Sequence, residues 1–148
     1  MILLDTNIVS EPWKPAPDGR VISWIDAQTI ETLFLSAVTV AELRFGIASM
    51  PAGKRQTTLH DRLEAEVLPL FEGRILSFDL RASAAFADPM TRAQKSGRAV
   101  GTADGYIAAI AASRGLIVAT RDTSGFEAAG VTVINPWTER CGHCAAIW

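Results

Sequence analysis

The first seven residues, MILLDTN (residues 1–7), place three aliphatic side chains directly before a carboxylate. Three aliphatic residues in a row, with no polar residue between them, are typical of a strand that is covered on both faces. Asp, Thr and Asn are also common in turns, so an ordinary turn would explain Asp5 without any function. The alternative hypothesis is that Asp5 ends a buried strand and belongs to a group of acids that the fold assembles from distant segments.

The bulk composition predicts one folded domain. The chain has 148 residues, of which 49% are hydrophobic and 20% are charged, and a chain of this kind can close a single apolar core. Its longest apolar runs are far shorter than the ~20 residues that span a bilayer. No basic region precedes the first apolar run, as it would in a signal peptide. We therefore expect a cytoplasmic protein that does not enter a membrane.

The overall charge argues against binding of nucleic acid through a generally basic surface. The net charge is −2 and the pI is ≈ 5.6, whereas proteins that rely on charge alone to bind nucleic acid are usually basic. Contact with nucleic acid would therefore require a local patch, a metal ion or a partner. Arg92, Lys95 and Arg98 recur at a spacing of three residues in RAQKSGR, although a solvated helix face explains this spacing without a ligand.

Short apolar runs alternate with segments of helical spacing along the chain. The apolar runs are ILLD (2–5), LFLSAV (33–38), RILSF (74–78), LIVAT (116–120) and VTVI (131–134). The helical segments are one around Val21, Trp24 and Ile25, and then 39–48, 54–71, 80–96 and 103–113. Strands that alternate with helices predict βαβ units around a mostly parallel sheet. The Pro-rich EPWKPAPDG (11–19) is expected to form the loop that joins the first strand to its neighbouring helix.

Four acids fall near the predicted ends of strands or the starts of helices. They are Asp5 at the end of the first strand, Glu42 in the opening turn of the helix after the second, Asp104 in the first turn of the helix before the fourth, and Asp122 just after the fourth. In open α/β sheets, functional sites lie beyond the carboxyl ends of the strands. We therefore expect these four carboxylates to meet at one edge of the sheet.

Each acid also has an explanation that requires no function. The segment from Thr39 to Glu42 fits a capping box, and Thr102 fits an N-cap that would leave Asp104 near the positive end of its helix. The four acids together are harder to explain in this way, because adjacent carboxylates repel and raise each other's pKa values. A divalent cation relieves this repulsion, and oxygen ligands without histidine favour Mg²⁺ or Mn²⁺ over zinc.

The segments that carry these acids resemble the motifs of a known family. The motifs are DTN (5–7), TVAEL (39–43), ADGYIAAIA (103–111) and ATRDTSGF (119–126). In this order they resemble PIN-domain ribonucleases, and among these the VapC-type toxins of type II toxin–antitoxin pairs, especially the FitB-like group. The likeness runs over residues 1–137, which we take as the PIN domain, and leaves 138–148 as a C-terminal tail.

The resemblance implies a fold and an activity. The fold is a PIN-like three-layer α/β/α arrangement with a central five-stranded parallel sheet, and the protein would be a homodimer. The activity would be Mg²⁺-dependent endonucleolytic cleavage of RNA, with Mn²⁺ as an alternative ion. The resemblance also implies a partner, a cognate antitoxin that is often a ribbon-helix-helix DNA-binding protein. Such an antitoxin would cover the acidic groove and bring operator DNA into the complex.

The resemblance also assigns roles to individual residues. The acidic quartet corresponds to Asp5, Glu42, Asp104 and Asp122, with Asp5 and Asp104 as the metal ligands. Thr6 and Thr120 correspond to polar residues that support the quartet, and Arg92, Lys95 and Arg98 are candidates for contact with the RNA. The chain departs from many family members at Gly125, where they have an acid before the Phe, so Asp122 would have to take the fourth position. Trp13 and Trp24 are candidates for dimer or groove surfaces.

Other hypotheses remain open from the sequence. Asp5 could be the nucleophile of a phosphoryl-transfer enzyme, although such enzymes usually have a second Asp where Asn7 stands. The His60-Asp61 pair resembles that of metal phosphohydrolases, but the only other histidine is His143, which favours a pair on a helix surface. Cys141 and Cys144 frame a CGHC tetrapeptide with too little chain after it to form an activating helix, so we interpret it as an exposed tail.

A non-enzymatic alternative is a catalytically silent subunit of a repressor complex. Such a subunit would bind its partner and, through it, DNA, without cleaving any substrate. The absence of one member of the quartet would favour this hypothesis. Because all four acids are present, hydrolysis is the stronger prediction.

Overall fold

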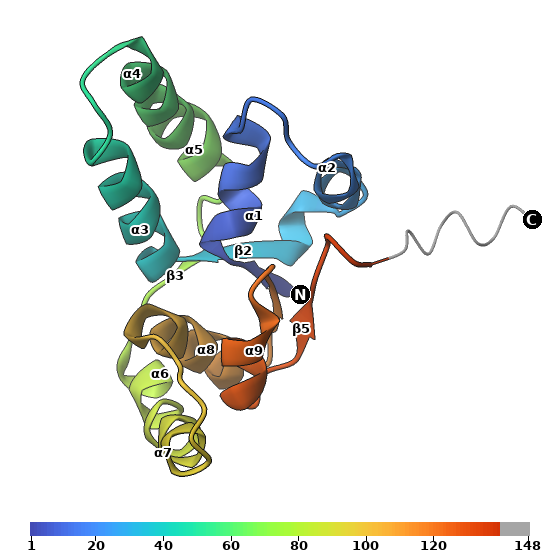
Figure 1. Cartoon of the computed structure of the whole chain (residues 1–148), viewed down its shortest axis with the longest axis vertical. Coiled ribbons are helices and arrows are strands. Elements are labelled where there is room, and N and C mark those ends of the chain that lie inside the picture. Colours follow the sequence, from blue (N-terminus) through green and yellow to red (C-terminus); the bar gives the residue numbers. More distant parts are fainter. Residues whose placement is uncertain (140–148) are drawn as a thin grey trace, which may run out of the picture.

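A computed structural model describes residues 1–139 of the chain as a five-stranded sheet between two groups of helices (Figure 1). The strands are β1 (Ile2–Leu4), β2 (Leu33–Ser36), β3 (Ile75–Leu76), β4 (Ile117–Ala119) and β5 (Val133–Ile134). Every pair of neighbours is parallel, and the order is β3-β2-β1-β4-β5. The predicted three-layer fold with a central five-stranded parallel sheet is therefore confirmed.

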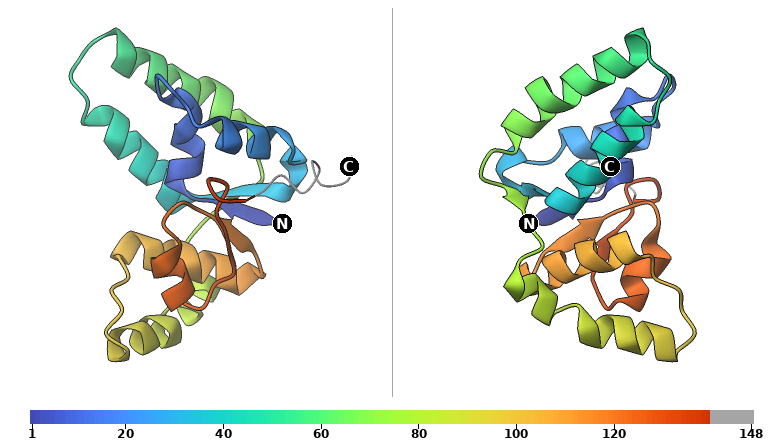
Figure 2. Two further views of the ribbon diagram at one scale, coloured as in Figure 1. Left: turned by 45° about the vertical axis from the view of Figure 1, so that its right-hand side comes forward. Right: turned by 90° about the vertical axis from the view of Figure 1, so that its left-hand side faces the viewer.

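Helices cover both faces of the sheet. They are α1 (Thr6–Ser10), α2 (Gly19–Asp26), α3 (Ala37–Ala48), α4 (Lys54–Asp61), α5 (Leu68–Leu70), α6 (Leu80–Ala84), α7 (Ala87–Lys95), α8 (Thr102–Arg114) and α9 (Thr123–Ala128). Helices α1 to α5 lie on one side of the sheet and α6 to α9 on the other, as the rotated views show (Figure 2). Within residues 1–139, no helix has both the length and the apolar character needed to cross a membrane.

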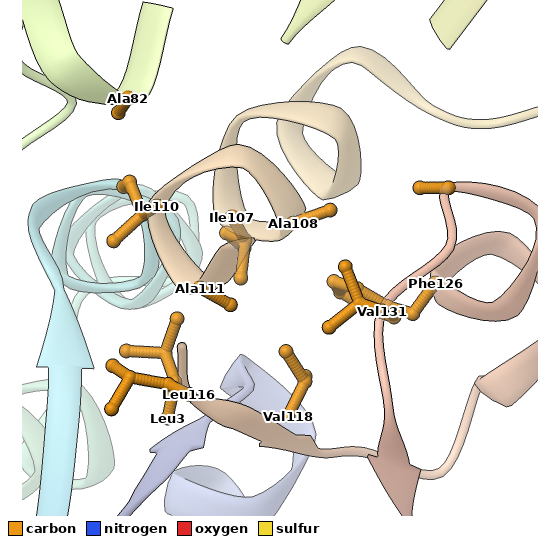
Figure 3. Packing of buried hydrophobic residues seen from close by; sticks show 11 residues of the cluster. Leu3, Ala82, Ile107, Ala108, Ile110, Ala111, Leu116, Val118, Phe126 and Val131 are labelled. Atoms are coloured by element: carbon orange, nitrogen blue, oxygen red, sulfur yellow. The ribbon is translucent and has the colours of Figure 1, made fainter. Parts of the chain in front are cut away.

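The alternation of side chains along each strand divides the core between these two helical layers. Successive strand residues point to opposite faces, so Leu3 and Val118 pack against α8 and α9 on one side. Figure 3 shows this cluster, in which Ile107 and Phe126 are fully buried. Leu4 of β1 points the other way, into the cluster around α1 and α2. Because both faces are covered, the strands consist of continuous apolar residues, as the sequence predicted.

The region after β1 differs from the prediction. The chain enters α1 at once, because Asp5 occupies the N-cap and its side chain accepts a hydrogen bond from the backbone N–H of Thr6. A short 3₁₀ helix, η1 (Glu11–Trp13), follows. The loop that we predicted over 11–19 is therefore wrong in its extent, and it does not follow the strand directly. A five-residue helix is too short to produce a recognisable hydrophobic period.

Prolines explain two departures in the predicted long helices. The helix predicted over 80–96 is divided into α6 and α7, and Pro89 lies in the first turn of α7, where a missing N–H is tolerated. The helix predicted over 54–71 is helical throughout but widens into a π-helix, η3 (Arg62–Val67). Its last N–H, that of Leu68, bonds to the carbonyl of Leu63, and Pro69 follows immediately. The wider turn makes room for the proline ring.

The order of the strands marks one place as the expected site. The chain moves outward from β1 through β2 to β3, and then returns to pair β4 with the opposite side of β1. Ile2 pairs with Leu33 on one side and with Ile117 on the other. The connections therefore leave in opposite directions between β1 and β4. In open parallel sheets the carboxyl ends at such a switch point form a crevice that holds ligands.

Candidate active site

Asp5 lies at this switch point, directly after β1. Its carboxylate is buried, with an exposed fraction of 6%. Oδ1 accepts a 2.8 Å hydrogen bond from the backbone N–H of Thr6, and Oδ2 accepts a 2.8 Å hydrogen bond from the hydroxyl of Thr120. Burial raises the pKa of Asp5, the two hydrogen bonds oppose that rise, and the charge of Asp122 adds to it. Asp5 is thus a fixed and partly desolvated carboxylate, not an exposed turn residue.

Thr120, at the end of β4, connects three segments of the site. It is fully buried, and besides donating to Asp5 its Oγ1 accepts the backbone N–H of Asp122 at 3.1 Å. The same oxygen accepts the side-chain amide of Asn7 at 3.4 Å. The oxygen of that amide in turn accepts the backbone N–H of Arg121 at 3.3 Å. The structure thus places Thr120 beside the quartet, as the resemblance implied.

Asn7 is a site residue that the sequence analysis did not assign. Its side chain spans the ends of β1 and β4, since it donates to the hydroxyl of Thr120 and accepts the backbone N–H of Arg121. The only sequence signal was its place as the third residue of DTN. A residue of this type at the end of a strand is explained equally well by a turn, so the sequence alone could not identify its role.

Glu42 reaches the site from α3. Its Oε1 accepts a 2.9 Å hydrogen bond from the hydroxyl of Thr6, so Thr6 lies between Asp5 and Glu42. The capping-box explanation of Glu42 is wrong, because α3 begins earlier than expected. Its N-cap is Ser36, whose hydroxyl oxygen accepts the backbone N–H of Thr39 at 2.9 Å. Glu42 therefore stands in the second turn of the helix, not in its opening turn.

Asp104 is the acid whose pKa is affected by all three of the others. It lies half-buried in the first turn of α8, which begins at Thr102 with Gly101 at the N-cap, so the predicted N-cap role of Thr102 is wrong. The pKa of Asp104 is raised to about 6, first by burial. The negative charges of its acidic neighbours raise it further, in the order Asp5, Asp122 and Glu42. Carboxylates from four segments are therefore close enough to repel one another.

Asp122 takes the N-cap position of α9 without capping it. Its side chain is exposed and caps no backbone N–H of the helix, but it accepts a 3.3 Å hydrogen bond from the hydroxyl of Ser124 in the first turn of α9. Gly125 lies at the same edge, since a Cβ built there would be 3.8 Å from Oδ2 of Asp104. The position where many family members have an acid thus faces the site, and in this chain Asp122 is the acid of that segment.

The donor set fits a hard divalent cation in kind. All four acids offer carboxylate oxygens, which Mg²⁺ and Mn²⁺ prefer, and their mutual repulsion at Asp104 is what a bound cation would relieve. Within residues 1–139, no three His, Cys, Asp or Glu side chains already stand close enough together to form a complete metal site.

The other residues singled out in the sequence either form no ion pair with the four acids within residues 1–139 or lie outside the described part. Arg92 and Lys95 are exposed on α7, and Arg98 is exposed just after it. His60 and Asp61 form a 3.4 Å surface pair on α4, as expected. Trp13 and Trp24 are partly buried and pack on different core clusters. The CGHC tetrapeptide and His143 lie outside residues 1–139.

The fold and the acidic edge define a class of protein, and the comparisons give the family. The sequence model of the PIN domain family matches residues 2–131, and the chain belongs to this family. It is 64% identical over 137 residues to the VapC ribonuclease Y4jK of Sinorhizobium fredii, covering 93% of this chain and 98% of the relative. It is 53% identical over 137 residues to the toxin FitB of Neisseria gonorrhoeae, covering 93% and 99%.

A solved structure agrees with these relatives. The structure of FitAB bound to an IR36 DNA fragment matches with a TM-score of 0.91 at 49% identity, covering 97% of this chain and 100% of the matched chain. The resemblance to the FitB-like group of VapC toxins, which the four motifs indicated, is therefore confirmed.

Proposed function

We propose that this protein is a metal-dependent endoribonuclease and the toxin component of a type II toxin–antitoxin pair. The observation that carries the proposal is the convergence on Asp104, whose pKa is raised by burial and then by the charges of three acids, which stand just after β1, in α3 and just before α9. Such repulsion is costly unless a cation compensates it. The similarity to a VapC ribonuclease over nearly the whole length of both chains supports RNA as the substrate.

The proposed roles follow from where the acids stand. Asp5 and Asp104 would hold Mg²⁺ or Mn²⁺, which when bound would stabilise negative charge on the phosphodiester and favour ionisation of the attacking water. Glu42 and Asp122 orient that water or accept its proton. Thr120 and Thr6 hold Asp5 and Glu42 in place, since each donates its hydroxyl proton to one of these carboxylates. Residues 1–137 form the catalytic domain.

The proposed partners follow from the relatives. A matched structure contains FitAB together with DNA, so we include a cognate antitoxin, of the ribbon-helix-helix class, that brings the complex to operator DNA. A net charge of −2 is compatible with a complex of this kind, because the affinity for DNA then resides in the antitoxin. A homodimer in the cytoplasm completes the proposal, with Arg92, Lys95 and Arg98 as candidate contacts for the RNA.

A second candidate function is that of a silent subunit in a repressor complex. The DNA-bound structure of a close relative favours it, because such a complex needs no catalysis by the toxin chain. The two candidates differ in what the acids do, so a cleavage assay separates them.

The experiment measures cleavage of RNA by the purified, antitoxin-free protein with Mg²⁺, with Mn²⁺ or with EDTA. Asp5→Asn and Asp104→Asn should each abolish metal-dependent cutting, whereas Asp61→Asn, which alters an exposed acid on α4, should retain it. Cutting that survives Asp5→Asn and Asp104→Asn would indicate a contaminating nuclease. Absence of cutting with either metal, together with no binding of Mn²⁺ by calorimetry, would favour the silent subunit.

A further inference from the structure

Helix α7 and the segment that returns from it to α8 lie on the opposite side of the sheet from α1 (Figure 1), and residues of both line a hollow. Its volume is about 450 Å³, within the range of pockets that hold small ligands. Its wall includes Phe86, Met90, Thr91, Gln94, Arg98 and Val100. Together with three alanines, the apolar side chains form most of this wall. Thr91, Gln94 and Arg98 contribute the polar groups. This is the usual composition of a site for a small organic ligand.

Two residues of the wall of the hollow, Phe86 and Met90, lie against Gly105, the residue next to Asp104. A Cβ built on Gly105 would lie 2.8 Å from Sδ of Met90 and 3.1 Å from Cε2 of Phe86. The wall of the hollow therefore touches the turn of α8 that carries the acid. Phe86 is held in place from behind, because its ring is stacked on Tyr106 with the centroids 5.1 Å apart. The hollow is thus a firm surface that adjoins the candidate active site.

The charges around the hollow favour an anionic ligand. Arg92, Lys95 and Arg98 stand on α7 and just after it, and none of them forms an ion pair with the residues of the described chain. Three unpaired cations on one short segment contrast with a net charge of −2 for the whole chain. These exposed cations make this segment locally positive, and such a patch attracts phosphate groups. Arg98 both lines the hollow and belongs to this group.

We propose that this hollow binds a nucleobase of the RNA that flanks the cleaved phosphate, and so contributes to the choice of cleavage site. The inference rests on the ribonuclease function proposed above. The base would lie against Phe86, Met90 and Val100, where stacking on an aromatic ring and apolar contact hold an unpaired base. Gln94 offers an amide to the edge of the base, and Arg98 offers its guanidinium to the base or to the adjoining phosphate. An acidic peptide would satisfy the cations but would leave the apolar wall unused.

The test uses a probe that does not depend on cleavage. Full-length Asp5→Asn protein in EDTA is mixed with a short single-stranded RNA that contains 4-thiouridine, irradiated, and digested for mass spectrometry. The proposal expects adducts on the peptide that contains residues 86–100. Adducts only on other segments, or no binding of the RNA, would overturn it. An acidic peptide that binds here while the RNA does not would overturn it as well.

Two variants locate the binding within the hollow. Ala99 is exposed and lines the hollow, so Ala99→Trp fills it without changing the charge, and Arg98→Ala removes the polar contact. Each should weaken binding of the RNA roughly tenfold, the loss expected for one stacked base. The matched controls are Ala27→Trp and Lys54→Ala, which alter exposed residues on the other face of the sheet and should leave the affinity unchanged. Equal affinity in all four variants would refute the proposal.

The cleavage pattern separates this inference from the proposed function. In active protein, Ala99→Trp should redistribute cutting among the sites of a long RNA. If the wild-type protein cuts RNA and this distribution is unchanged, the inference fails and the ribonuclease function stands. If the RNA forms adducts at the hollow but no metal supports cutting, the binding site stands and the ribonuclease function fails.

Discussion

The hydroxyl of Thr120 donates a 2.8 Å hydrogen bond to the buried carboxylate of Asp5, across 115 positions of sequence. This contact joins the ends of β1 and β4, the two strands between which the connections of the sheet change direction. The same oxygen of Thr120 accepts the backbone N–H of Asp122. One small side chain therefore fixes the position of the acid at the end of β1 relative to the segment that follows β4.

Replacing Thr120 with valine should weaken both the fold and the site. Valine keeps the shape of the side chain but leaves a buried carboxylate oxygen without its donor, at a cost of ~1–3 kcal/mol in the free energy of unfolding. Loss of a residue that orients a metal ligand typically lowers metal affinity or activity ~10–100-fold. Urea unfolding and the rate of RNA cleavage measure the two effects. Thr120→Ser is the control, because it keeps the hydroxyl and should retain most of both.

The raised pKa of Asp104 predicts a loss of stability as pH rises. In the metal-free protein its pKa is about 6, against 3.8 without the surrounding structure. Between these two values the folded state holds the proton more tightly than the unfolded state, so the free energy of unfolding falls as pH increases from about 4 to about 6. Asp104→Asn should reduce this fall, and urea unfolding in EDTA across this range measures it. An identical slope in the wild-type and variant proteins would contradict the assignment.

Adding a divalent cation should reverse this trend in the wild-type protein. Binding to the folded state alone stabilises it in proportion to the logarithm of the ion concentration. We expect Mn²⁺ to raise the midpoint of thermal unfolding more at pH 7 than at pH 5, because protonation of Asp104 competes with the ion at the lower pH. The Asp104→Asn variant should lose this pH-dependent difference. An equal rise in both proteins would place the ion elsewhere.

Gly105 should not tolerate a side chain, whereas Gly46 should. A Cβ at Gly105 would lie 3.1 Å from a ring carbon of Phe86 and closer still to the sulfur of Met90, while at Gly46 of α3 nothing lies within 4 Å. Replacing glycine with alanine inside a helix gains ~0.5–1 kcal/mol when there is room. Overpacking costs ~1–3 kcal/mol. Chemical unfolding should therefore show that Gly46→Ala stabilises the protein and Gly105→Ala destabilises it.

The true cap of α3 can be tested independently of the site. Ser36→Ala removes the side chain that accepts the backbone N–H of Thr39, and loss of an N-cap costs ~1 kcal/mol. We expect this loss in urea unfolding. Glu42 keeps its hydrogen bond with Thr6 in this variant, so the rate of RNA cleavage should change less than in Thr120→Val. A loss of activity as large as that of Thr120→Val would mean that the start of α3 positions Glu42.

The sequence was sufficient to predict the frame of the fold. Apolar runs such as those at Ile2–Leu4 and Ile117–Ala119 are strands because both faces of a parallel sheet are buried. Their alternation with helices predicted a parallel sheet, and the positions of the acids near strand ends and helix starts predicted that they would meet at its carboxyl edge. It was insufficient for short elements such as α1, which has too few residues for a hydrophobic period.

The local ends of the helices were also beyond the reach of the sequence. The segments at Thr39 and Thr102 contain good capping residues, yet the helices begin at Ala37 and Thr102, with Ser36 and Gly101 at their N-caps. Several residues near each helix start satisfied the same capping preferences, so the sequence could not distinguish the N-cap from its neighbours.

The sequence by itself determined which residues form the buried strands and that four acids follow one another in the order of the motifs, because hydrophobic periodicity and residue type are local properties. Only the tertiary structure decided that Thr120 donates to Asp5, that Thr6 stands between Asp5 and Glu42, and that burial and three neighbouring charges raise the pKa of Asp104. Those relationships depend on distances between segments far apart in the chain, and such distances are fixed only when the sheet is assembled.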